Sequence, residues 1–250
     1  MKAAHELVFL LDVDNTLLDN DRFASDLWRR LEWDFGAEGL DRYRAMLEAR
    51  RCTLGYADYL GALQDFRFDA ASDRGDGSRL LQMSSFMIDY PFAHRLYPRA
   101  LDVIAHLATL GTPVIFTDGD VVYQPRKVQR AGLWDAVVGR VLVCVHKEKV
   151  LDSVQSLYPA SHYVLVDDKP RVLAAVKAVL RDRVTTVFPR QGHYALDEAS
   201  VAHHPPADIS IEHIGDLLEF DVDRLCTSER SRTDDARIAS PSDFASRGRS

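Results

Sequence analysis

The chain has 250 residues, which is enough for one α/β core and a smaller second domain, and its apolar content of 46% is that of a soluble globular protein. Acidic side chains outnumber Lys and Arg by 38 to 31, and the formal charge of -7 argues against a nucleic acid as the main partner. No apolar run is long enough to cross a membrane, and the three cysteines show no disulfide or metal spacing, so we expect a cytoplasmic protein.

The first predicted element is a short apolar strand, residues 8–11, which runs directly into two aspartates. Asp12 and Asp14 are spaced i, i+2 and are followed by Asn15 and Thr16. An apolar run of this length bounded by charge is typical of the buried central strand of a parallel sheet. Ligands bind at the carboxyl ends of such strands, so the two carboxylates can serve one ligand in different roles. A solvated strand end is the alternative, and the pair alone does not decide between the two.

Helices are predicted throughout the next block, residues 21–90, because apolar side chains recur there at helical spacing and no strand pattern interrupts them. A block of this size is sufficient for a small helical bundle. The predicted helices are Asp21–Asp34, ended by Gly36, then Leu40–Arg50, Tyr56–Phe66 and Ser78–Ile88. Five aromatic residues are expected in the core of this bundle rather than against a substrate, namely Phe23, Trp28, Trp33, Tyr43 and Tyr59.

From Leu96 onward, strands and helices alternate with short connections, which predicts a parallel sheet with right-handed crossovers. The fold class is therefore α/β, with a Rossmann-like parallel sheet core formed by residues 1–20 and 91–222 and a helical domain formed by residues 21–90. The stretch 223–250 is rich in Ser, Arg and Asp, which predicts a disordered tail. The predicted strands of the second part are 113–116, 141–145, 163–166, 184–188 and 207–211.

Four of the predicted strands end in polar groups. Parallel strands place all their carboxyl ends at one edge of the sheet, so we expect a single shared site there. Any one of these groups is weak evidence, whereas four in order, each after an apolar strand, favour one site strongly. The groups are Asp12 with Asp14, Thr117 with Asp118 and Gly119, Lys147, and Asp167 with Asp168.

The motif Asp12-Val13-Asp14-Asn15-Thr16, followed in order by the other three groups, resembles the haloacid dehalogenase superfamily, whose phosphatases open with Asp-x-Asp-x-Thr on the first strand. The resemblance covers about residues 8–220. It implies a small all-helical cap inserted after the first strand, which matches the predicted helical block. It also implies Mg²⁺-dependent hydrolysis of a small phosphorylated metabolite, a phosphomonoester, through an aspartyl-phosphate.

The resemblance assigns roles to the carboxylates. Asp12 would attack the phosphorus, and Asp14 would protonate the leaving oxygen and then activate the water that hydrolyses the intermediate. Mg²⁺ would be held by Asp12, by the main-chain carbonyl of Asp14 and by Asp168, while Asp167 would act through water or hold a lysine. Lys169 stands beside these acids, where it could weaken metal binding or contact the substrate.

The resemblance also assigns the phosphate contacts. Thr117, in a loop with Asp118 and Gly119, would hydrogen-bond a phosphoryl oxygen, and Lys147 would neutralise the charge shared by nucleophile and phosphate. Lys149 is the alternative to Lys147, which is preferred because of its interval to the following predicted helix. Asp118 departs from the Asn or Gly that many relatives carry at its position.

Two further loops at the same edge carry Arg126, Lys127 and His193, and our hypothesis is that one of these side chains contacts the substrate. The alternative is that they are solvated residues of loops and helix starts. Three other functions stay open beside phosphatase activity. A 2-haloacid dehalogenase needs the nucleophile but neither the second Asp nor the metal, a phosphomutase would need a cap that grips a phosphosugar, and a non-catalytic relative would bind a phosphorylated ligand. The sequence leaves the substrate and the oligomeric state open.

Overall fold

Six parallel strands form one sheet in the order β3-β2-β1-β4-β5-β6 in the computed structural model, which describes residues 7–68 and 77–226. β1 lies in the middle of the sheet, where Leu11 pairs with Ile115 of β2 on one side and with Val166 of β4 on the other. The Rossmann-like α/β core predicted from the sequence is confirmed. The strands are β1 Leu7–Leu11, β2 Thr112–Asp118, β3 Val141–Cys144, β4 His162–Val166, β5 Val184–Pro189 and β6 Ile209–Ile211.

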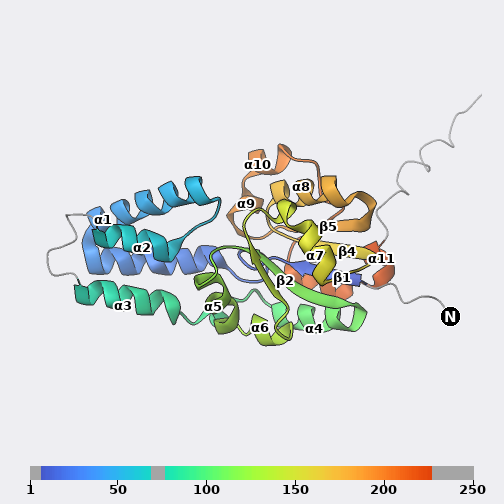
Figure 1. Cartoon of the computed structure of the whole chain (residues 1–250), viewed down its shortest axis with the longest axis horizontal. Helices are drawn as coiled ribbons and strands as arrows, with labels where there is room; N and C mark the ends of the chain where they lie inside the picture. The colour runs from blue at the N-terminus through green and yellow to red at the C-terminus, as the bar shows by residue number, and fades with distance from the viewer. Residues whose placement is uncertain (1–6, 69–76, 227–250) are drawn as a thin grey trace, which may run out of the picture.

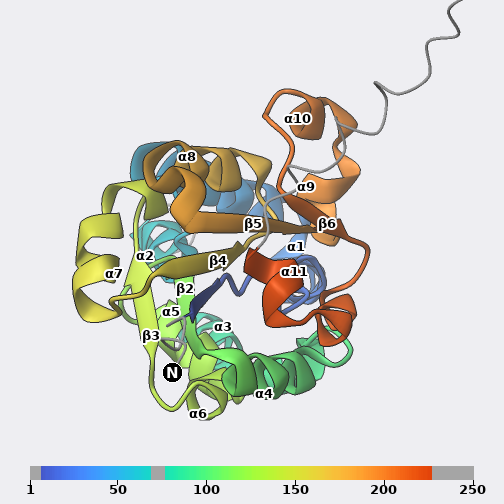
Figure 2. The same cartoon turned by 90° about the vertical axis from the view of Figure 1, so that its right-hand side faces the viewer.

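Helices cover both faces of the sheet, which is why β1 is apolar at every position. Phe9 and Leu11 pack on one face against α4, α5 and α6, and Val8 and Leu10 pack on the other against α7 and α8. Figure 2 shows α7 and α8 on one side of the strands and α4 and α6 on the other. These helices are α4 Ala100–Leu110, α5 Tyr123–Arg130, α6 Leu133–Ala136, α7 Leu151–Leu157 and α8 Pro170–Leu180.

Three helices, α1 Asn20–Leu54, α2 Tyr59–Phe68 and α3 Gly77–Ile88, extend from one end of the sheet (Figure 1) and are called the helical region below. Gly36 interrupts α1 with φ 74° and ψ 174°, so the predicted stop is a break within one long helix. The division of the chain into a core and a helical domain stays a prediction.

The aromatic side chains of the helical region are largely buried, as expected. Phe23, Tyr43 and Tyr59 lie in its core, and Trp28 packs against that core. The prediction for Trp33 was wrong, because its side chain is 87% exposed. Trp33 follows the buried Leu31 by two residues, and at about 3.6 residues per turn such a step leads to the opposite, outer face of α1.

The remaining short elements complete the core. They are α9 Gly192–Leu196, α10 Glu198–Ala202, α11 Val222–Cys226 and the 3₁₀ turns 92–95, 147–149, 181–183 and 214–219. α11 extends past the predicted start of the tail at residue 223, and its Leu225 is buried, so residues 223–226 belong to the fold. The rest of the predicted tail, 227–250, lies outside the described residues.

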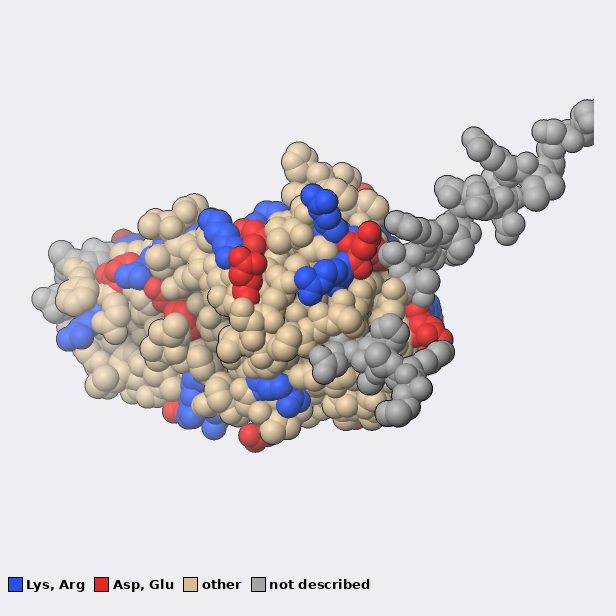
Figure 3. Space-filling view, turned by 45° about the vertical axis from the view of Figure 1, so that its right-hand side comes forward, with Lys and Arg blue, Asp and Glu red and all other residues tan. Residues whose placement is uncertain are grey.

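The surface carries charges of both signs. On the face drawn in Figure 3, Lys and Arg side chains lie next to Asp and Glu side chains rather than in one large patch of a single sign. Within residues 7–68 and 77–226, no helix combines the length and the apolar character that crossing a membrane requires.

Candidate active site

The loops after β1 and β4 bring the predicted carboxylates together at one edge of the sheet. The backbone N–H of Asp12 donates to the carbonyl of Val166, the last residue of β4, at 3.0 Å. Thr16 joins the two loops, because its hydroxyl donates to Asp12 Oδ2 at 3.3 Å and accepts from the backbone N–H of Asp168 at 3.0 Å. Thr16, the threonine of the Asp-x-Asp-x-Thr motif, therefore links Asp12 to the backbone of Asp168.

Lys147 is the buried cation of this edge. Its Nζ donates to Asp12 Oδ1 at 2.5 Å and to Asp167 Oδ2 at 2.6 Å, and its side chain is fully buried. Burial by itself would lower the pKa of Lys147, but the charges of Asp12 and Asp167 outweigh it and hold that pKa well above its ordinary value. Lys149, the alternative from the sequence, is exposed. Of the two lysines, Lys147 is the one that contacts Asp12.

Asp12, Asp167 and Asp168 form a buried cluster that suits a hard metal cation. An oxygen atom from each of the three lies within 4.8 Å of the others. Both carboxylate oxygens of Asp168 are buried, and among the described residues no donor reaches them. Burial raises the pKa of Asp168 well above its ordinary value, since the bare charge is poorly stabilised there. Oxygen ligands of this kind fit Mg²⁺, and a bound cation would supply the partner that Asp168 lacks.

The loop after β2 is held by hydrogen bonds from its surroundings. Gln124 of α5 donates through Nε2 to Thr117 Oγ1 at 2.9 Å, and the N–H of Gly119 donates to the carbonyl of Cys144 at 3.1 Å. Gly119 has φ 154°, and a Cβ there would lie 2.9 Å from the Cβ of Gln124, so the close approach requires glycine. The Thr117 hydroxyl donates to the Asp118 carbonyl over a long 3.4 Å, so its proton can turn toward a ligand.

Asp14 lies apart from the acidic cluster and faces α5. Lys127 Nζ lies 2.8 Å from its Oδ1 and 2.9 Å from its Oδ2, and Gln124 Nε2 lies 3.3 Å from its Oδ2. The side chain of Asp14 is 26% exposed and lines a pocket, whereas that of Asp12 is buried. Lys127 thus contacts a predicted site residue, while its neighbour Arg126 pairs with Asp89 at 3.1 Å and does not line the pocket.

The pocket has a volume of about 410 Å³ and is lined by the sheet edge and by the helical region. Arg51, Tyr56 and Tyr59 come from the helical region or the loop between its first two helices. Arg51 Nη2 donates at 2.9 Å to the hydroxyl of Tyr194 in α9, so a hydrogen bond joins the two sides. No sequence pattern indicated Arg51 or Tyr56, because a helical region positions such side chains only through its packing on the core.

His193 and Lys169 also line this pocket. The Nδ1 atom of His193 lies 2.7 Å from Asp21 Oδ1, and its backbone N–H donates to Asp21 Oδ2 at 2.8 Å. Burial raises the pKa of Asp21, but these contacts outweigh it and the pKa lies below its ordinary value. Lys169 Nζ lies 3.9 Å from Asp118 Oδ2 and over the ring of Tyr194, and its positive charge also acts on Asp12 and Asp168.

The comparison with known proteins decides the family. No protein-family model and no curated protein matches the sequence, but a solved structure does. The chain is 57% identical to a haloacid dehalogenase-like hydrolase from Burkholderia xenovorans LB400, over 87% of this chain and 99% of that one, with a TM-score of 0.81. This chain belongs to the haloacid dehalogenase-like hydrolases. The resemblance inferred from the motif at Asp12 is thereby confirmed.

Two more distant structures share the fold of this haloacid dehalogenase-like hydrolase. The L-2-haloacid dehalogenase of Xanthobacter autotrophicus is 18% identical over 87% of this chain and 98% of that one, with a TM-score of 0.55. A haloacid dehalogenase-like hydrolase of Bacillus subtilis, solved with bound magnesium, is 15% identical over 87% and 98%, with a TM-score of 0.59. At these identities the likeness concerns the fold alone.

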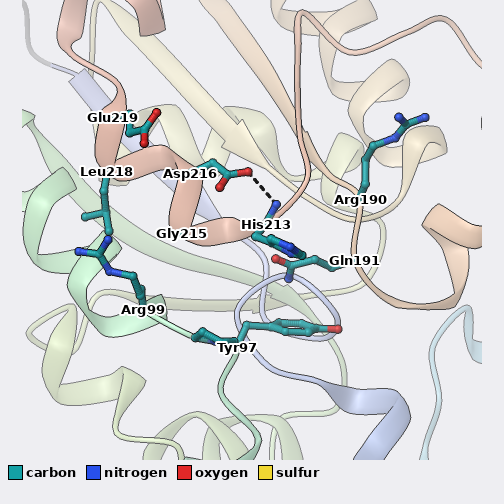
Figure 4. A pocket seen from close by; sticks show the side chains of 10 residues that line it. Tyr97, Arg99, Arg190, Gln191, His213, Gly215, Asp216, Leu218 and Glu219 are labelled. Carbon is teal, nitrogen blue, oxygen red and sulfur yellow. Dashed lines mark hydrogen bonds between the residues drawn. The ribbon is translucent and has the colours of Figure 1, made fainter.

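A second pocket of this hydrolase, about 540 Å³, lies between the start of α4 and the segment after β6 (Figure 4). Its residue Asp216 accepts hydrogen bonds from the backbone N–H groups of His213 at 2.9 Å and Glu212 at 3.0 Å. Arg190 pairs with Glu212 at 3.6 Å. This pocket shares no lining residue with the one beside Asp14.

Proposed function

We propose that this hydrolase cleaves a small phosphomonoester with the help of Mg²⁺, through an aspartyl-phosphate on Asp12. The observation that carries the proposal is the buried cluster of Asp12, Asp167 and Asp168, in which both oxygens of Asp168 lack a partner among the described residues. Asp168 of this cluster and a second acid, Asp14, both line the pocket. A phosphatase of this kind needs both features.

In the first step of the proposed reaction, Asp12 attacks the phosphorus and the bond to the leaving oxygen breaks. Asp14 gives its proton to that oxygen, and the ester's alcohol departs. Lys147, bound to Asp12 at 2.5 Å, offsets the negative charge that nucleophile and phosphate bring together. Thr117, with the neighbouring Asp118 and Gly119, would hold the phosphoryl oxygens.

In the second step, Asp14 takes a proton from a water molecule, which attacks the phosphorus and frees Asp12 and inorganic phosphate. Asp12 and Asp168, with the main-chain carbonyl of Asp14, would hold Mg²⁺, which supplies positive charge to the phosphoryl oxygens when bound. Asp167 is held by Lys147 at 2.6 Å and by the backbone N–H of Lys169 at 2.9 Å. These contacts indicate that Asp167 orients Lys147 rather than binding the metal through a water molecule.

The helical region would act as the cap of the superfamily. Its residues Arg51, Tyr56 and Tyr59 line the pocket, whose volume of about 410 Å³ suits a small phosphorylated metabolite. A cytoplasmic location is part of the proposal, because the three cysteines have no disulfide-like spacing.

Hydrolysis of a 2-haloacid is the alternative reaction on this fold. It needs a carboxylate nucleophile but neither a second carboxylate nor a metal. This chain has Asp14 in the pocket and Asp168 in a buried cluster. The dehalogenase reaction would give neither carboxylate a role. The residues therefore favour the phosphatase.

The test is hydrolysis of p-nitrophenyl phosphate with and without Mg²⁺, by the wild type and by Asp12→Asn. We expect turnover that depends on the metal and falls by roughly 10³-fold or more in the variant, which lacks the nucleophile. Lys149→Met, at an exposed position of the same turn, is the matched control and should keep its turnover. Chloride release from a 2-chloroacid without metal, in place of phosphate release, would support the dehalogenase instead.

A further inference from the structure

Lys127 is a buried cation whose hydrogen bonds go to Asp14 and to Asn20 at the start of α1. Its side chain is 1% exposed, and its ammonium group has three acceptors: Asp14 Oδ1 at 2.8 Å, Asp14 Oδ2 at 2.9 Å and Asn20 Oδ1 at 3.1 Å. An ammonium group has three N–H donors, so each has a partner. Within the described part of the chain, Asp14 is the one carboxylate that pairs with Lys127.

Four aromatic rings surround this ammonium group. Its Nζ lies 5.6 Å from the ring centroid of Tyr123, 5.7 Å from that of Phe92, 5.8 Å from that of Phe23 and 5.9 Å from that of Tyr59. The faces of such rings attract a cation, and their bulk keeps water away from it. Phe23 and Tyr59 belong to α1 and α2 of the helical region, and Figure 1 shows α5, which carries Lys127, at its junction with the sheet.

A second side chain of α5, that of Gln124, also contacts Asp14. Gln124 precedes Lys127 by three residues, which places both on one face of the helix. Gln124 Nε2 lies 2.9 Å from Thr117 Oγ1 and 3.3 Å from Asp14 Oδ2. One helix face thus joins the acid at the end of β1 to the threonine at the end of β2.

We propose that Lys127 is a positioning residue for Asp14: it holds that carboxylate in the orientation required for proton transfer, and the rings of the helical region hold Lys127 in place. The inference rests on the proposed phosphatase reaction and adds a residue that none of its steps includes. Both carboxylate oxygens of Asp14 are engaged by one ammonium group, so its side chain is restricted to one rotamer. A small misplacement of a reacting group can cost about 10²-fold in rate.

The predicted signature is a loss that depends on the leaving group. Phenol, with a pKa of about 10, needs a proton from Asp14 as it departs, whereas p-nitrophenolate is a much weaker base and departs without one. The ratio kcat/KM reports the steps up to departure of the leaving group and excludes later hydrolysis of the intermediate. Comparison of phenyl phosphate with p-nitrophenyl phosphate, two esters of nearly the same size, therefore isolates proton donation by Asp14.

The experiment uses Lys127→Met, which keeps the length of the side chain against the rings and removes its charge and donors. We expect kcat/KM for phenyl phosphate to fall about 10²-fold and that for p-nitrophenyl phosphate only a few-fold. Lys127→Arg, which keeps the charge, should recover part of the loss with the same selectivity. Arg126→Met is the matched control, because Arg126 occupies the same helix and pairs with Asp89 away from the pocket. It should retain wild-type values for both esters.

A double-mutant cycle separates positioning from general damage. If Lys127 acts only through Asp14, Lys127→Met introduced into Asp14→Asn causes no further loss with phenyl phosphate. An equal loss for both esters, no loss, or an additive loss in the cycle overturns the inference while the proposed function stands. If Lys127→Met does not fold, the cycle is run with Lys127→Arg and judged in the same way. A wild type without turnover of either ester overturns the proposed function, and this inference with it.

Discussion

Removal of the buried charge of Lys147 is expected to destabilise the fold as well as the reaction. Lys147→Met leaves Asp12 and Asp167, which are 2% and 0% exposed, without the cation that lies 2.5 and 2.6 Å from them. Breaking a buried ion pair by removing one partner typically costs 3–5 kcal/mol, because the other charge stays buried. Since Lys147 has two carboxylate partners, we expect about 4–5 kcal/mol here.

The assay is thermal unfolding followed by circular dichroism, in EDTA so that no divalent cation replaces the missing charge. In a chain of this size, each kcal/mol lowers the melting temperature by roughly 2–4 °C, so Lys147→Met should melt about 8–20 °C below the wild type. Lys149→Met is the matched control. Its side chain is exposed two residues away, and we expect a shift of no more than about 2 °C.

Excess Mg²⁺ should reduce the difference between Lys147→Met and the wild type, because a cation bound by Asp12 and Asp168 replaces part of the lost charge. A Lys147→Met protein that melts within about 3 °C of the wild type in EDTA would refute the reasoning. It would mean that the carboxylates of Asp12 and Asp167 are stabilised by something other than the ammonium group.

Mg²⁺ is expected to stabilise the wild type by about 2.7 kcal/mol at 100 times its Kd and to leave Asp168→Asn nearly unchanged, as scanning fluorimetry across a Mg²⁺ titration would show. Equal shifts in both proteins would contradict the metal site. Gly119→Ala should lower kcat/KM for p-nitrophenyl phosphate by about 10-fold. The added Cβ would lie 2.9 Å from the Cβ of Gln124, so Gly119 and the neighbouring Thr117 would shift away from the phosphoryl oxygens that they are proposed to hold. An unchanged kcat/KM would mean that the loop adapts freely. Asp208→Asn should lower the free energy of unfolding at pH 7 by about 1–3 kcal/mol, since Asp208 accepts from Lys177 at 2.8 Å and from a backbone N–H and a hydroxyl of β5. Burial raises the pKa of Asp208, but these hydrogen bonds outweigh it and bring that pKa below 3.8. The contribution is therefore complete above about pH 4 and is lost as the pH falls through the lowered value, so urea unfolding at about pH 3 should show a smaller difference from the wild type. A difference that persists unchanged at that pH would contradict the ion pair.

The sequence was sufficient for the fold because each strand carries its own signal. β1, β2, β4 and β5 are largely apolar runs that end in polar or turn residues, and such runs are typical of the buried strands of a sheet covered on both faces. Parallel order then requires the polar ends to meet at one edge, so the proximity of Asp12 to Asp167 and Asp168 could be predicted. The family followed from the motif at Asp12 and the order of the other groups.

Helical spacing within residues 21–90 predicted helices but could not fix how they pack. The break at Gly36, where φ is 74°, turns two predicted helices into one interrupted helix. The contributions of Arg51 and Tyr56 to the pocket depend on how the helical region packs on the sheet edge. Spacing along one helix contains no information about either.

The sequence by itself determined which segments form strands and which polar residues meet at the carboxyl ends of those strands. Local apolar patterns decide the strands, and the parallel arrangement of strands joined by helices brings their carboxyl ends to one edge. Only the tertiary structure decided which charged groups pair. It brought Lys147 rather than Lys149 to Asp12, and it placed Lys127 on Asp14 rather than in solvent. The physical reason is that a buried charge is stable only beside a partner, and partners more than 100 residues apart in the chain, as Lys127 and Asp14 are, become neighbours only when the whole chain has packed.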